Sequence, residues 1–240
     1  MTVKEHYDHH LGDLYSWMSG DFETRKQEFR DFLETNGIHP GSSKIALDLG
    51  CGHGIQSVAL AGTGYEVIAV DFNRQLLDEL ALNSSGLPVK IVDGDILDLS
   101  AYAKDKPELI LCWGDTLTHL QDTGTIRQFL SDCSSILVPG GSLLLSFRDY
   151  STPLSGDSRF IPVKSDESRI LTCCLDYGKT HVMVTDILHF HTNEGWRQKV
   201  SSYYKVRIAP NEIIRILEQN DLSIIFRDIM FGMTRLIARK

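Results

Sequence analysis

The 240-residue chain lacks the features that mark several classes of protein. Its five cysteines show no CxxC spacing, which argues against a disulfide framework and against a zinc finger. Its longest apolar runs, such as residues 141–147, are as long as a strand and too short to cross a bilayer. The first residues show no basic start followed by an apolar stretch, so we expect no signal peptide. These absences predict a cytoplasmic protein with no membrane partner.

Positive charge is also scarce, because 24 lysines and arginines stand against 32 aspartates and glutamates. The net charge of −8 and the lack of any lysine or arginine run disfavour a nucleic acid partner. Metal-binding patterns such as HExxH are missing as well. His189 and His191 lie on one face of a predicted strand near Asp186, but nothing else supports a site there. We therefore expect no bound metal.

Strand and helix patterns alternate over residues 44–150. Short apolar runs predict strands buried on both faces, and the stretches between them predict helices. This alternation predicts right-handed crossovers and a doubly wound α/β sheet. Before it, Asp21 and Asn36 mark the start and the end of a helix. After it, residues 151–208 predict an antiparallel β insertion, and residues 209–240 a helix followed by a hairpin.

A glycine-rich loop follows the first predicted strand, in the sequence LDLGCGHG, with glycines at Gly50, Gly52 and Gly54. Glycine lets the backbone turn sharply and lets a ligand approach it closely. Nicotinamide and flavin enzymes use a similar loop, but their fingerprint requires glycine where Ile55 stands. Asp48, just before the loop, would repel a pyrophosphate and would tolerate a ligand with an amino group and a sulfonium. Both residues disfavour a dinucleotide.

Acidic residues end the next two predicted strands. Asp71 ends the second, where a carboxylate can accept hydrogen bonds from both hydroxyls of a ribose. The third ends in DGDIL, and Asp95 is placed to accept from an adenine amino group, with Asp93 as the alternative. Ile96 would contact the ring or donate its backbone N–H. Phe72 can lie against the adenine or belong to the core.

Together these residues resemble class I S-adenosylmethionine-dependent methyltransferases, whose E/DxGxGxG motif LDLGCGHG matches closely. The resemblance runs from Lys44 to the C-terminus. It implies a Rossmann-like, seven-stranded, mostly parallel sheet with an antiparallel last strand. It also implies S-adenosyl-L-methionine as cofactor and S-adenosyl-L-homocysteine as product. The glycines and Cys51 would then surround the methionine part, Asp71 would bind the ribose and Asp95 would lie near the adenine. The layout is also similar to a bacterial subgroup with no assigned substrate.

The fourth predicted strand ends in LILCWGDTLTHL, which is similar to a region beside cofactor and substrate in glycine N-methyltransferase-like enzymes. Ligands bind beyond the carboxyl ends of such strands, so we expect Cys112 and Trp113 at the cofactor. Asp115 and His119 are candidates for a general base, and a structural histidine is the alternative. Trp113 and Asp115 replace Leu and Asn of the related pattern. This disfavours an amino acid acceptor, whereas a carboxylate suits a cationic amine.

Two further regions are expected to close the site. Tyr15 and Trp17 precede the first predicted core helix and would cover the cofactor, or would pack that helix on the sheet. Arg148 and Tyr150 follow the fifth predicted strand and are expected to bind the acceptor. Arg148 could hold an anionic group, and surface pairing with Asp149 or Asp157 is the alternative.

We therefore expect one methyltransferase domain over residues 1–240. Residues 1–43 would form a lid and a helix, and residues 44–150 the cofactor-binding core. Residues 151–208 would shape the acceptor site, and residues 209–240 would complete the sheet. The predicted reaction is direct in-line methyl transfer to a nitrogen or oxygen of a small molecule. An NAD(P)-dependent oxidoreductase and a non-catalytic binder are the alternatives, and a homodimer is compatible with the sequence.

Overall fold

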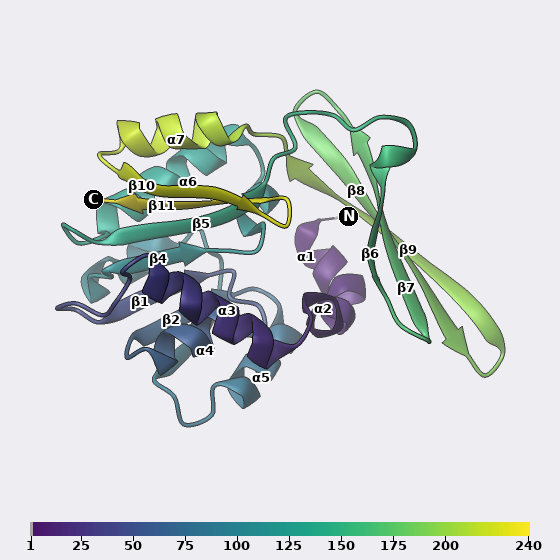
Figure 1. The fold of residues 1–240 in the computed structure, drawn as a ribbon, viewed down its shortest axis with the longest axis horizontal. Coiled ribbons are helices and arrows are strands. Elements are labelled where there is room, and N and C mark those ends of the chain that lie inside the picture. Colours follow the sequence, from purple (N-terminus) through teal and green to yellow (C-terminus); the bar gives the residue numbers. More distant parts are fainter. Residues whose placement is uncertain (1) are drawn as a thin grey trace.

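The structure, a computed structural model, describes residues 2–240 and contains two sheets (Figure 1). The larger sheet has seven strands in the order β10-β11-β5-β4-β1-β2-β3. Their bounds are β1 (Ile45–Leu49), β2 (Glu66–Asp71), β3 (Val89–Asp93), β4 (Leu109–Cys112), β5 (Ser142–Arg148), β10 (Ser223–Met230) and β11 (Met233–Arg239). The chain of β1 to β5 is parallel throughout, and β11 is antiparallel to both its neighbours. The predicted fold class is confirmed.

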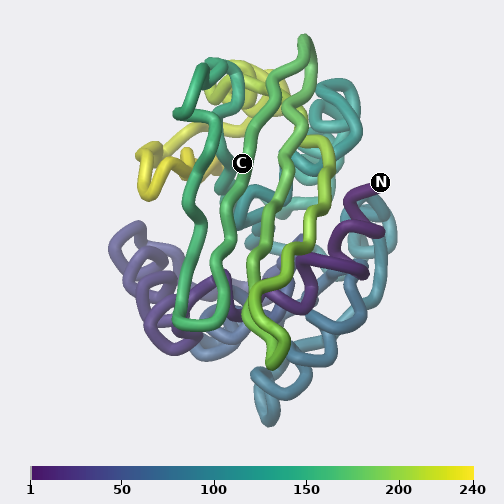
Figure 2. The backbone as a smooth tube through the Cα atoms, turned by 90° about the vertical axis from the view of Figure 1, so that its right-hand side faces the viewer, coloured from purple at the N-terminus to yellow at the C-terminus, as the bar shows by residue number. Residues whose placement is uncertain are grey.

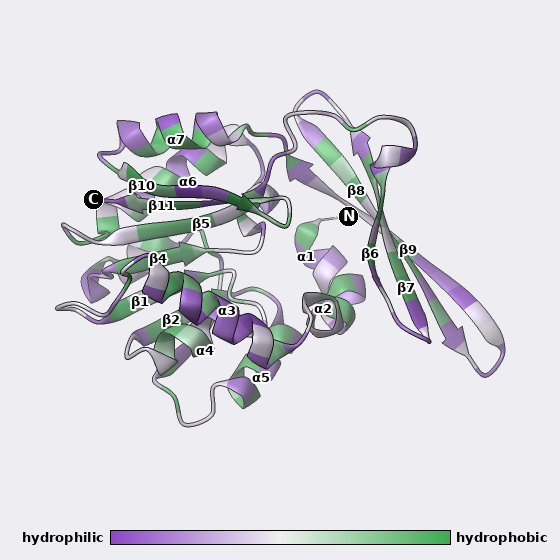
Figure 3. Cartoon of the chain, viewed as in Figure 1, coloured by the Kyte–Doolittle hydropathy of each residue, from purple (hydrophilic) through white to green (hydrophobic). Residues whose placement is uncertain are grey.

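Helices cover both faces of this sheet. One face carries α3 (Phe22–Thr35), α4 (Ile55–Gly62) and α5 (Arg74–Asn83). The other carries the 3₁₀ turn η2 (Leu99–Asp105), α6 (Thr123–Ile136) and α7 (Pro210–Gln219). Figure 3 shows hydrophobic residues running along the central strands, whereas α3 and α7 alternate between hydrophobic and hydrophilic positions. This pattern follows from burial of the sheet on both faces and of each helix on one.

The strand order places β1 and β4 side by side at the centre of the sheet, although the chain reaches β4 only after forming β2 and β3. The connections from β1 and from β4 therefore leave the sheet in opposite directions. Such a switch point opens a crevice at the carboxyl ends of the strands, where ligands of open α/β sheets bind. The glycine loop follows β1 at this edge, and the short turn η3 (Thr116–His119) follows β4.

The second sheet is antiparallel, in the order β6-β7-β8-β9. Its strands are β6 (Phe160–Ser165), β7 (Arg169–Tyr177), β8 (His181–Thr192) and β9 (Gly195–Val206), preceded by the turn η4 (Gly156–Arg159). Side chains alternate along β8 between buried and partly exposed, as expected for a sheet with one covered face. Figure 1 shows this sheet apart from the central one, across its carboxyl edge, and Figure 2 shows its strands side by side in front of the rest of the chain.

Three short helical segments at the N-terminus occupy the space between the two sheets (Figure 1). They are α1 (Val3–His6), the π-helix η1 (Tyr7–Leu11) and α2 (Gly12–Ser19). The following α3 begins where predicted, because the Asp21 carboxylate accepts a hydrogen bond from the Thr24 N–H, and Asn36 caps its end. Within residues 2–240, no helix is long and apolar enough to span a membrane.

Candidate functional site

The glycine loop adopts a backbone conformation that side chains disfavour. The φ angles are +77° at Gly50, +52° at Gly52 and +95° at Gly54. A Cβ atom at Gly50 would lie 2.5 Å from the Thr116 side chain, and one at Gly54 would lie 2.1 Å from that of Leu80. The positive φ angles and the lack of room for a side chain therefore both require glycine in this loop. The loop packs against η3 on one side and α5 on the other.

Asp71, at the end of β2, is buried and bonded to the glycine loop. One carboxylate oxygen accepts from the Gly52 N–H at 2.9 Å, and the other accepts from the Asn73 N–H at 2.9 Å. Burial raises the pKa of Asp71, although these backbone donors oppose the shift. The carboxylate thus lies directly beside the loop, as the sequence predicts for a ribose-binding group.

Asp48 is only 2% exposed, within β1 just before the loop. Its carboxylate accepts a 2.6 Å hydrogen bond from the Ser57 hydroxyl, and no lysine or arginine of residues 2–240 pairs with it. Burial raises the pKa of Asp48 to about 7, with the Ser57 bond opposing this shift. A buried carboxyl group without a cation suits a ligand that brings a positive charge.

The expected adenine contacts lie at the end of β3. Ile96 is buried and Asp95 is exposed, with one Asp95 oxygen accepting from the Leu97 N–H at 2.9 Å. Asp93 is exposed as well, and pairs in register with Asp71 across β2 and β3. Phe72 is partly exposed beside them, so its ring is accessible from the carboxyl edge.

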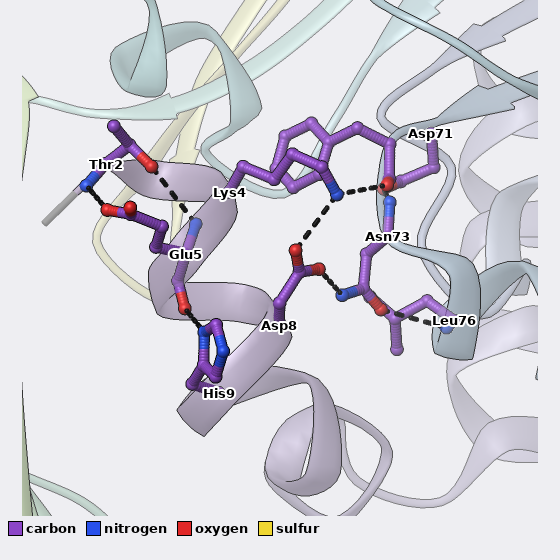
Figure 4. Close-up of polar contacts among 9 residues, drawn as sticks. Thr2, Lys4, Glu5, Asp8, His9, Asp71, Asn73 and Leu76 are labelled. Carbon is purple, nitrogen blue, oxygen red and sulfur yellow. Dashed lines mark hydrogen bonds and ion pairs between the residues drawn. The ribbon is translucent and has the colours of Figure 1, made fainter.

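The N-terminal segments lie over this edge. The Tyr15 ring of α2 approaches Gly52 so closely that an added Cβ would lie 3.2 Å from it, and burial raises the Tyr15 pKa to about 12. Figure 4 shows how α1 and η1 are held. The Asn73 side chain donates to Asp8 at 2.9 Å, and the Lys4 ammonium donates to the Phe72 carbonyl at 3.2 Å. These segments are therefore attached to the same turn that carries Asp71.

Trp17 faces in another direction from Tyr15. Its ring lies under the Arg169 guanidinium at 4.4 Å, and its carbonyl accepts from the Lys164 ammonium at 2.5 Å. It packs with Leu14 against Leu171 and other residues of the antiparallel sheet. Within one helix, Tyr15 thus contacts the glycine loop while Trp17 contacts the insertion.

Asp115 lies at the carboxyl end of β4 with φ +75° and is 4% exposed. One of its oxygens accepts from the Thr118 hydroxyl at 2.9 Å and from the Arg148 N–H at 2.8 Å. The other accepts from the Tyr150 hydroxyl at 3.0 Å and from the Lys205 ammonium of β9. Four donors thus surround one carboxylate, joining β4, β5 and the insertion. The Arg148 side chain itself turns toward the β10–β11 turn, 3.4 Å from the Phe231 carbonyl.

His119, at the end of η3, lies between rings. Tyr203 of β9 stacks on it at 5.4 Å, and Tyr7 meets it edge-on at 5.8 Å. Its Nδ1 is buried and has no hydrogen-bond partner among residues 2–240. Burial, followed by the charge of Lys205, holds the pKa of His119 well below its usual range, so the imidazole is neutral. A neutral imidazole offers a proton acceptor. A hollow of about 370 Å³ opens beside it.

The other residues expected near the cofactor are more deeply packed. Cys112 is fully buried, which raises the pKa of its thiol, and Cys51 is buried in the glycine loop. Trp113 packs on α3, with its ring 5.3 Å from those of both Phe29 and Phe32. In residues 2–240, no group of three or more acidic, histidine or cysteine side chains is arranged to hold a metal ion.

The sequence did not point to Lys205 or Tyr203. Both lie on the insertion, in strands without a sequence motif, and reach the site only because β9 packs against η3. His6 was likewise not anticipated as part of the site: its ring stacks on Tyr203 at 4.1 Å and bonds to Asp186 at 3.2 Å. In the structure Ser201, Tyr203 and Lys205 are buried on one face of β9, a position that no motif in the sequence marks.

Comparisons with known proteins agree with this geometry. The chain matches a family model described as a methyltransferase domain over residues 46–141. It is 28% identical to the cypemycin N-terminal methyltransferase of Streptomyces sp, covering 72% of this chain and 75% of that protein. It is 27% identical to the glycine N-methyltransferase of Rattus norvegicus, covering 70% and 63%. The solved CcbJ methyltransferase of Streptomyces caelestis shares its fold, with a TM-score of 0.77 over 97% of both chains at 17% identity.

Residues 46–141 thus match a methyltransferase domain, and the chain as a whole is similar to S-adenosylmethionine-dependent methyltransferases. S-adenosylmethionine is accordingly its cofactor, and S-adenosylhomocysteine the product. The family's glycine loop and acidic residues are in place, and the buried, unpaired Asp48 carboxyl fits a cationic ligand. The chain spans 25% to 63% of the length of the glycine and ubiquinone-pathway relatives it matches.

Proposed function

We propose that this methyltransferase acts on a nitrogen or oxygen of a small metabolite, by direct in-line displacement. The observation that carries this proposal is the setting of His119 beyond β4, where its imidazole lies among the rings of Tyr7 and Tyr203 and its buried Nδ1 has no partner among residues 2–240. The N-terminal segments and the antiparallel sheet both lie over this edge of the central sheet (Figure 1), and such a cover suits a small acceptor better than a polymer. Relatives include enzymes named for N- and for O-methylation.

S-adenosylmethionine supplies an activated methyl group on a positively charged sulfur. In the proposed arrangement, Asp71 holds the ribose, Asp95 and Ile96 the adenine, and the glycine loop with Asp48 the methionine part. Tyr15 covers them. Most of the rate then comes from alignment and exclusion of water, so the residues' main task is to position the two reactants.

His119 is proposed as the general base for an acceptor that must lose a proton. Its neutral imidazole and unpartnered Nδ1 support this role. Asp115 holds neighbouring segments together and is not proposed as a base, because its four hydrogen bonds leave it no free lone pair for an acceptor. Arg148 and Tyr150 remain proposed acceptor contacts, Tyr150 beside Asp115 and Arg148 near the β10–β11 turn.

Methyl transfer is tested by incubating the protein with methyl-labelled S-adenosylmethionine and a panel of small amines, phenols and hydroxy acids. Label should appear in one chemical class, and His119→Asn should lower that rate while leaving the affinity for S-adenosylhomocysteine unchanged. Tight S-adenosylhomocysteine binding without transfer to any acceptor would instead identify a non-catalytic binder.

We also propose a cytoplasmic location and a homodimeric state. The composition supports the first, because the five cysteines are all free. Exposed Trp196, Val200 and Tyr204 on one face of β9 support the second. Sedimentation at several concentrations tests the assembly.

A further inference from the structure

Lys205 is a buried lysine at the point where the insertion meets the carboxyl edge of the central sheet. Its side chain is 8% exposed, and it forms an ion pair with Asp115. Its ammonium also lies 5.8 Å from the ring centres of Tyr150 and Tyr203. An ammonium carries three N–H donors, and within residues 2–240 only the Asp115 oxygen accepts from one of them. Two donors are therefore left for another group.

Lys205 and His119 both lie next to Tyr203. The Tyr203 ring stacks on the imidazole at 5.4 Å, and its centre lies 5.8 Å from the ammonium. The positive charge of Lys205 also acts directly on the imidazole, which stays neutral beside it. The surroundings of Tyr203 thus combine a cation that has spare donors with a neutral ring nitrogen that has no partner among residues 2–240.

From this juxtaposition we infer that the acceptor is an oxygen nucleophile, of the phenol or hydroxyl class, whose oxygen binds the Lys205 ammonium and whose proton passes to His119. This inference rests on the proposed methyl transfer and decides between the two acceptor atoms left open there. It gives Lys205 the role of stabilising negative charge on the nucleophilic oxygen.

The chemistry of the donors favours oxygen over nitrogen. Lys205 can donate but cannot accept, so it has nothing to offer the N–H groups of a neutral amine. A protonated amine would meet a buried like charge. Asp115, the carboxylate that could have balanced such a cation, already accepts from four donors. An oxygen that develops negative charge, in contrast, gains a charge-assisted hydrogen bond.

The proposed step is balanced within the site. The acceptor O–H bond breaks and its proton goes to the free nitrogen of His119, which becomes an imidazolium. The oxygen–carbon bond forms as the sulfur–carbon bond breaks, and the bonding pair stays on sulfur, which becomes neutral. The imidazolium later releases its proton to solvent. Lys205 stays protonated throughout.

The test uses 4-nitrophenol as an acceptor probe on the full chain in complex with S-adenosylhomocysteine, because its absorbance reports whether it is bound as the phenolate. S-adenosylhomocysteine binding is first measured by calorimetry in the same sample. If it fails, the methyltransferase assignment itself is refuted. If it succeeds, the titration of the bound probe tests Lys205 alone. The isosteric 4-nitroaniline is the matched nitrogen probe.

We expect the bound nitrophenol to ionise at a pH about one unit below that of the free probe, a tenfold shift toward the phenolate. Lys205→Met should abolish the shift, and Lys199→Met, an exposed lysine of the same strand, should retain it. Because Lys205→Met leaves Asp115 unpaired, the double variant with Asp115→Asn is measured too. It should bind S-adenosylhomocysteine but show no shift.

Three results would overturn the inference: a probe that titrates as it does in water, a shift that survives in the double variant, or 4-nitroaniline bound as tightly as 4-nitrophenol. Absence of saturable nitrophenol binding in a sample that binds S-adenosylhomocysteine would also overturn it.

Discussion

The buried Asp48 carboxyl group should make the free protein less stable as the pH rises. Its pKa is about 7 in the folded chain, against an ordinary value of 3.8. The folded state therefore holds a proton that the unfolded state has lost between about pH 4 and pH 7. Stability falls with pH wherever the folded state binds more protons. The difference of about three units between the two pKa values corresponds to about 4 kcal/mol of the free energy of unfolding, and this contribution is lost by the time the pH passes 7.

Asp48→Asn removes this titration and keeps the size of the side chain. Urea unfolding of both proteins without ligand, at about pH 4 and pH 8, measures the effect. The wild type should lose about 4 kcal/mol more of its free energy of unfolding than the variant over this interval. The same substitution should weaken S-adenosylhomocysteine binding, because the ligand's ammonium loses its counter-charge. Equal pH dependence in the two proteins would refute this account of the β1 carboxyl group.

Three further perturbations probe the loop, the base and the lid. Gly52→Val should lower the affinity for S-adenosylhomocysteine by about tenfold or more in calorimetry, because φ is +52° and Tyr15 lies against the added side chain. The control is Gly62→Val, at a helical glycine with open space around it, which should leave that affinity unchanged. His119→Asn should lower kcat/KM by about 100-fold and leave the affinity for S-adenosylhomocysteine intact. Because the pKa of His119 lies well below 6.5, the kcat/KM of the wild type should not fall when the pH is lowered to about 6. A fall of kcat/KM centred near that pH would contradict a neutral base. Trp17→Ala should destabilise the chain by about 3 kcal/mol and speed hydrogen exchange in α2, whereas unchanged exchange would show that its packing on the insertion is not what holds the segment.

The central sheet could be predicted from the sequence because each of its features is local. Alternating strand and helix periods, the glycine loop and the acidic strand ends each occupy a few neighbouring residues. A parallel sheet then brings the ends of β1, β2 and β4 to one edge whatever the remaining chain does. This is why Asp71 and Gly52, far apart in sequence, were expected together and are hydrogen-bonded.

The acceptor side could not be predicted in the same way, because it depends on contacts between distant segments. Asp115 was interpreted as a free base or amine-binding group, yet its partners Tyr150 and Lys205 come from outside its own strand. Trp17 was grouped with Tyr15 by its position in sequence, but neighbouring residues of a helix point in different directions. The N-terminal segments were expected as a lid without any indication that η1 is a π-helix.

The most direct test of the central claim is a calorimetric titration of the full chain with S-adenosylhomocysteine, repeated on Asp71→Ala. We expect saturable binding at one site per chain, weakened by at least about tenfold in the variant because the ribose hydroxyls lose a charged acceptor. No heat of binding for the wild type up to roughly millimolar ligand, or equal affinity in the two proteins, would contradict it.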